Sequence, residues 1–164
     1  MYALSHRPDH IPQTMKKFSK AALLFLTAAF IGIQAVPVDR NNPPVITDLE
    51  APAEVKKIIR RSCYDCHSNE VQWPWYSRVA PISWLVAYDV EEGREDLNFS
   101  DWDTYANDRG MIEEIIEEIE EGDMPLRKYL ITHPNASVSK DELNLLRQWA
   151  GVSRHSHEDH HDED

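Results

Sequence analysis

The sequence predicts a small all-α domain of about four helices, and two observations carry this prediction. No stretch of the chain sustains the two-residue alternation of apolar and polar side chains that marks a half-buried strand. Four stretches instead place their apolar residues three and four positions apart, which is the spacing of one helix face. The chain of 164 residues has room for one such domain together with terminal appendages.

The first two predicted helices flank the two cysteines of the chain. Residues 53–62 form the first helix, which ends at Cys63 and has an apolar face of Val55, Ile58 and Ile59. Residues 82–93 form the second, and Gly93 suits its C-terminal end. The apolar stripe of this second helix consists of Ile82, Leu85, Val86 and Val90.

The third and fourth predicted helices have the clearest ends. The third begins near Met111 and ends at Gly122. Its apolar face is formed by Met111, Ile112, Ile115, Ile116 and Ile119, and glutamates cover the rest of its surface. The fourth begins with Ser139-Lys140-Asp141-Glu142, which is a capping-box sequence, and ends at Gly151. Residues 53–152 are therefore the predicted domain.

The N-terminal part of the chain has the pattern of an export segment. Residues 1–14 read as an irregular extension, so that either Met1 or Met15 could be the start. Residues 15–38 combine lysines with an uncharged apolar run that is short for a bilayer core and long for a signal peptide. Both a cleaved signal peptide and a membrane anchor stay open, and either puts the domain on the periplasmic side of the cytoplasmic membrane. Residues 39–52 form a proline-rich linker.

The most informative motif is Cys63-Tyr64-Asp65-Cys66-His67. Two cysteines three positions apart and an adjacent histidine form the attachment pattern of c-type haem. The thiols form thioethers with the haem vinyl groups, and the histidine ligates the iron. The motif thus predicts one haem c, attached through Cys63 and Cys66 and ligated by His67. A redox dithiol, half of a zinc site and a disulfide are the alternatives.

Met124 is the predicted second ligand of the iron. It lies between Gly122 and Pro125, in an irregular segment from which a thioether can project inward. Ligation by His and Met is usual in electron-transfer cytochromes c. His133 is the alternative ligand, because histidine is the commonest metal ligand. Met111 belongs to a helix face and is assigned to the core.

Aromatic residues follow the cysteine motif closely and predict one wall of a haem pocket. They are Trp73, Trp75 and Tyr76. Ordinary core packing is the alternative for all three. Arg78 is the candidate partner of a haem propionate, with a solvated surface arginine as the alternative.

Negative charge is concentrated in residues 89–123, which contain fifteen Asp or Glu and two Arg, a local net charge of −13. Nucleic-acid binding is disfavoured, because no basic patch is present to neutralise phosphates. The acidic region is either a solvated helix face or a docking surface for a basic redox partner. The tail, residues 153–164, is rich in His and acidic residues; weak metal binding and simple disorder are both open.

Several segments together resemble the small haem-binding domain proteins of bacteria. The resemblance covers roughly residues 40–150 and implies a cytochrome-c-like, exported, often membrane-anchored protein with one haem. The resemblance does not identify a substrate or a partner. The segments that carry it are Cys63–Asn69, Trp73–Ser77, Val79–Leu85, Asp89–Arg94, Leu97–Ser100 and Met124-Pro125.

These observations predict a monohaem c-type cytochrome that transfers single electrons in the periplasm, rather than an enzyme. The alternative is a haem-based sensor or binder of small ligands, in which the position opposite His67 is weakly held or empty. A haem enzyme such as a peroxidase is less favoured, because no distal acid–base pair stands out in the sequence.

Overall fold

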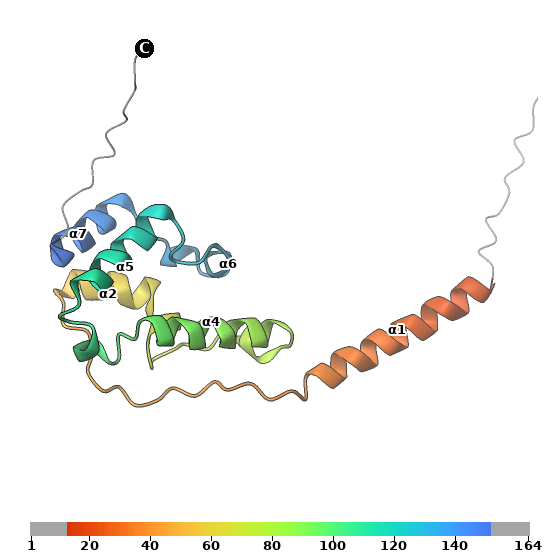
Figure 1. Cartoon of the computed structure of the whole chain (residues 1–164). Coiled ribbons are helices and arrows are strands. Elements are labelled where there is room, and N and C mark those ends of the chain that lie inside the picture. Colours follow the sequence, from red (N-terminus) through yellow and green to blue (C-terminus); the bar gives the residue numbers. More distant parts are fainter. Residues whose placement is uncertain (1–12, 152–164) are drawn as a thin grey trace, which may run out of the picture.

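The computed structural model describes residues 13–151, and their secondary structure is helical apart from one isolated β-bridge between Thr47 and Asp101. This confirms the predicted all-α class. Helix α1 (Gln13–Ile33) extends away from the domain (Figure 1). No helix in residues 13–151 is both long and apolar enough to cross a membrane. The predicted tail and all but the last two residues of the predicted extension lie outside the described residues.

Four longer helices build the domain, as the sequence predicts. They are α2 (Ala53–Ser62), α4 (Ile82–Asp96), α5 (Arg109–Glu121) and α7 (Lys140–Ala150). Helices α2, α5 and α7 gather on one side, and α4 lies along the other (Figure 1). The short elements between them are α3 (Tyr64–His67), η1 (Trp75–Arg78), η2 (Trp102–Thr104), α6 (Arg127–Leu130) and η3 (Pro134–Ala136).

The helix ends follow from local chemistry. Ser139 caps α7: its side chain accepts from the Glu142 backbone N–H, and the Glu142 carboxylate accepts from the Ser139 N–H at 2.9 Å. Gly122 and Gly151 end α5 and α7 with φ of 82° and 68°, a conformation that glycine adopts without strain. Helix α4 runs three residues beyond its predicted end at Gly93.

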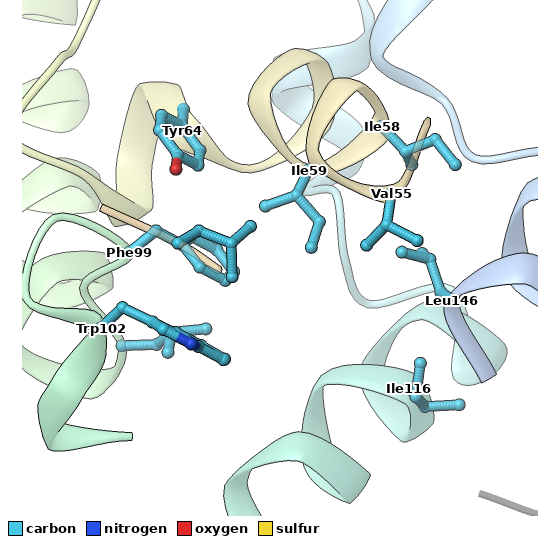
Figure 2. Packing of buried hydrophobic residues seen from close by; sticks show 10 residues of the cluster. Val55, Ile58, Ile59, Tyr64, Phe99, Trp102, Ile116 and Leu146 are labelled. Carbon is cyan, nitrogen blue, oxygen red and sulfur yellow. The ribbon is translucent and has the colours of Figure 1, made fainter. Parts of the chain in front are cut away.

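The core is an aromatic stack that meets an aliphatic cluster. Tyr64, Phe99, Trp102 and Trp149 follow one another with ring centroids 5.6 to 5.9 Å apart. Figure 2 shows Tyr64, Phe99 and Trp102 beside the aliphatic residues of α2, with Ile116 of α5 and Leu146 of α7 opposite. The amphipathic faces of three helices thus pack against one core, which fixes the end of α2 and therefore the position of Cys63.

The proline-rich stretch 39–52 runs along the domain surface. The Asn42 side-chain amide donates to the Val71 carbonyl at 3.0 Å, and the Ile46 N–H donates to the Ser100 carbonyl at 2.8 Å. Leu49 is only 1% exposed and belongs to the core cluster. The stretch therefore packs against the domain, and it contributes to the core as well as connecting α1 to α2.

An ion pair joins α2 to α7. The Arg61 guanidinium donates to the Glu142 carboxylate at 2.7 Å. This bond, followed by the backbone N–H of Ser139, lowers the pKa of Glu142 from 4.5 to about 2. Because the folded protein holds the lower pKa, the stabilisation is present above about pH 4.5 and is lost as the pH falls toward 2.

We expect Glu142→Gln to lower the free energy of unfolding by about 1–2 kcal/mol at neutral pH, since the pair is partly exposed to solvent. The difference from the wild type should shrink as the pH falls from about 4.5 toward 2. Urea unfolding at a series of pH values measures both effects. Glu50→Gln, at an exposed position, is the matched control, and equal pH dependence in the two variants would contradict the assignment.

Candidate haem-binding site

The cysteine motif forms the turn from α2 into α3. The His67 N–H donates to the Cys63 carbonyl at 2.9 Å, so the motif closes one helical turn. Residues spaced three and four positions apart on a helix share a face, which groups Cys63, Cys66 and His67. Both cysteines are free, and burial raises the pKa of each thiol to about 12, so both are protonated at neutral pH.

The His67 ring is oriented by the backbone. Its Nδ1 lies 3.1 Å from the carbonyl oxygen of Leu97. A carbonyl can only accept, so Nδ1 carries the proton and Nε2 keeps its lone pair for a metal. Burial lowers the pKa of His67, while the hydrogen bond to the Leu97 carbonyl opposes that shift. The residue is therefore held as a neutral imidazole, the form that ligates iron.

Helix α4 packs against the motif because Gly93 lies at the point of contact. A Cβ at this position would lie 3.0 Å from the Cys66 carbonyl oxygen and 3.2 Å from the Cys66 Cβ.

The buried residues of α4 are all small or medium in size: Ser83, Val90 and Gly93. Ile82 and Leu85 of the predicted apolar stripe are each 48% exposed, so the stripe faces the core only in part.

Two adjoining cavities open beside the motif. They have volumes of about 310 and 260 Å³ and share the wall residues Ser62, Cys63, His67, Asp96, Met124 and Pro125. The first cavity is mainly apolar, with the further wall residues Leu97, Phe99, Met111, Ile115, Ile119 and Val138. Cys66 lines the second cavity, which also has acidic and tyrosine side chains in its wall.

Met124 is far from the cysteine motif in the sequence but lies next to it in the fold. It follows α5 directly, is half-buried and lines both cavities, as His67 does. The structure thus brings Cys63, Cys66, His67 and Met124 around one space. Met111, assigned to the core from the sequence, packs against the core and also lines the first cavity.

His133 lines neither cavity. Its ring stacks on Tyr129, with centroids 4.2 Å apart and an interplanar angle of 13°. Its Nδ1 lies 3.0 Å from the Thr132 hydroxyl. This placement favours Met124 over His133 as the candidate ligand.

The predicted aromatic wall lies outside the two cavities. Trp75 and Tyr76 line an outer cavity of about 330 Å³ on the far side of Cys66, and Trp75 is 77% exposed. Trp73 lines a separate hollow against α4, and Arg78 is exposed and lines none of these cavities. The element that carries Trp75 and Tyr76, η1, packs against α4. The prediction of Trp73 and Arg78 as pocket residues therefore gains no support.

The apolar wall residues Leu97, Phe99, Ile115, Ile119 and Val138 were not among the predicted site residues. Part of the signal was present, because Ile115 and Ile119 belong to the apolar face of the helix predicted in this region. Acidic side chains also border the cavities, namely Asp65, Asp89, Glu92, Asp96, Glu114 and Glu118. Burial, and then the neighbouring carboxylates, raise the pKa of Glu118.

Residues 28–151 match the family described as haem-binding domain. The chain belongs to the haem-binding domain family. This confirms the resemblance found in the sequence and supports haem as the cofactor. Searches of curated proteins and of solved structures give no match.

The residues around the two cavities fit a haem. An imidazole with its Nδ1 proton held by a backbone carbonyl and a thioether line the same space, and apolar side chains form most of the first cavity wall. These are the donor atoms and the surroundings that haem iron and its macrocycle require. In residues 13–151, no group of three or more His, Cys, Asp or Glu side chains could hold a metal ion, as a zinc site would need.

Proposed function

We propose that this protein is a monohaem c-type cytochrome that transfers single electrons. The observation that carries the proposal is that His67 and Met124 line the same two cavities, with both cysteines beside them. In this proposal Cys63 and Cys66 would hold the haem through thioethers, and His67 and Met124 would ligate its iron. The haem supplies a one-electron couple whose potential is raised by methionine ligation.

The side chains of the site are suited to electron transfer. The Leu97 carbonyl keeps the His67 ring in one orientation, which would hold Nε2 in a fixed position toward a bound iron. Apolar residues of α5 and the buried Phe99 form much of the wall of the first cavity. A site with two protein ligands and a mainly apolar wall favours electron transfer over the binding of an external ligand.

We further propose a basic redox partner and a periplasmic location. Six acidic residues border the cavities, and such a border attracts a positively charged surface at low salt. The location is supported by the lysines and the uncharged apolar run of residues 15–38, the composition of an export or membrane-tethering segment. Thioether attachment requires export of the chain before the haem is added.

The covalent attachment is tested by replacing Cys63 and Cys66 with Ala. We expect the wild type to retain its haem through extraction with acidified solvent, because thioethers survive this treatment. The double variant should lose all covalent haem, as measured by the absorbance left in the protein fraction. Complete extraction of haem from the wild type would contradict thioether attachment, while leaving haem binding itself intact.

The axial ligand is tested by comparing Met124→Ala with Met111→Ala and His133→Ala. Loss of the thioether should abolish the weak near-infrared sulfur-to-iron band and lower the reduction potential. Met111→Ala removes a thioether from the same cavity, and His133→Ala removes the alternative ligand, so both should retain the band. Loss of the band in either of these variants, with retention in Met124→Ala, would reassign the ligand.

A further inference from the structure

We propose that Tyr129 and Asp65 are positioning residues whose hydrogen bond holds the Met124 segment closed over the haem site. The inference rests on the proposed function, because it takes Met124 as the axial ligand. It adds that Asp65, which lies within the cysteine motif, holds the segment that carries Met124.

The upstream side of Met124 is fixed by the end of α5. The backbone N–H groups of Asp123 and Met124 both donate to the Glu118 carbonyl at 3.0 Å. Gly122 makes this possible by adopting a left-handed conformation. The chain therefore leaves α5 in one defined direction, but nothing in this turn holds the residues that follow Met124.

The downstream side is tied to the cysteine motif. The Tyr129 hydroxyl donates to Asp65 Oδ2 at 2.8 Å, across 64 positions of sequence. Asp65 lies between the two cysteines, and its Oδ1 accepts from the Gln72 N–H at 3.0 Å, so the carboxylate is itself held in place. A hydrogen bond to a charged acceptor is stronger than one between neutral groups. It connects the element that carries Cys66 and His67 with the segment that carries Met124.

The neighbours of Tyr129 keep it in position to make this bond. Its ring stacks on His133, and its side chain lines the second cavity and the outer cavity. Burial, and then Asp65, raise the pKa of Tyr129, so the hydroxyl stays a donor at neutral pH. The adjacent Lys128 makes a second tie, with its ammonium group 2.7 Å from Asp89 on α4. The stacking also explains the placement of His133 outside the two cavities.

Loss of the hydrogen bond between Tyr129 and Asp65 should increase the fraction of molecules in which Met124 is not bound to the iron. That fraction is measured by the rate at which carbon monoxide binds to the reduced holoprotein, because carbon monoxide needs the vacated position. We expect Tyr129→Phe to bind carbon monoxide about tenfold faster than the wild type, the change that follows from one hydrogen bond to a charged group. Lys128→Met should give a smaller increase, about two- to fivefold, because this pair is more exposed.

The matched control is Tyr105→Phe, the same substitution at a partly buried tyrosine that packs against the core and lines neither cavity. It should bind carbon monoxide at the wild-type rate. Thermal unfolding of all variants separates a local opening from general destabilisation, since a merely structural role would alter unfolding of Tyr129→Phe without accelerating the carbon monoxide reaction. Lys128→Met replaces an exposed side chain and supplies the comparison if Tyr129→Phe does not fold.

Two results would overturn the inference, and they are distinguishable. If the wild type has the sulfur-to-iron band but Tyr129→Phe and Lys128→Met bind carbon monoxide at its rate, the positioning role is wrong and the proposed function stands. If the wild type lacks the band and binds carbon monoxide promptly, Met124 is not the ligand, and the proposed function fails together with this inference.

Discussion

The hydrogen bond between His67 and the Leu97 carbonyl is the constraint on which the rest of the site depends. At 3.1 Å it fixes the proton on Nδ1 and leaves Nε2 available to a metal. Leu97 can reach the ring because α4 ends there, and α4 can approach the cysteine motif because Gly93 has no side chain. The orientation of one imidazole is therefore set by the packing of a whole helix.

The position of Met124 is also set by how a helix packs and where it ends. Helix α5 contributes its apolar face to the first cavity and then ends at Gly122, which directs Met124 toward the cysteine motif. The aromatic stack connects Tyr64 of α3 to Trp149 of α7 through Phe99 and Trp102, so packing of the last helix supports the element that carries His67. A haem would complete this arrangement as a large apolar body, which is what a domain of about this size lacks in its own core.

The sequence predicted the parts of this fold that have a local signal. Amphipathic spacing identified all four longer helices, and Ser139, Gly122 and Gly151 marked their ends. Trp73 was assigned to the pocket as an aromatic residue close to the motif, and Arg78 as a charged partner of a propionate, but neither residue type nor nearness in sequence decides which cavity a side chain lines. Helix α6 is too short to show a period, and the bond between Tyr129 and Asp65 spans 64 positions, so neither leaves a local pattern.

Electron paramagnetic resonance of the oxidised wild-type protein reports the ligand field of the iron without any substitution, so it tests whether two residues of this chain ligate the iron. A haem held by both His67 and Met124 would have a low-spin iron, so we expect a low-spin ferric signal only. A dominant high-spin signal would show an iron with a weak or missing sixth ligand. That result would contradict the electron-transfer account and favour a protein that binds small ligands at its haem.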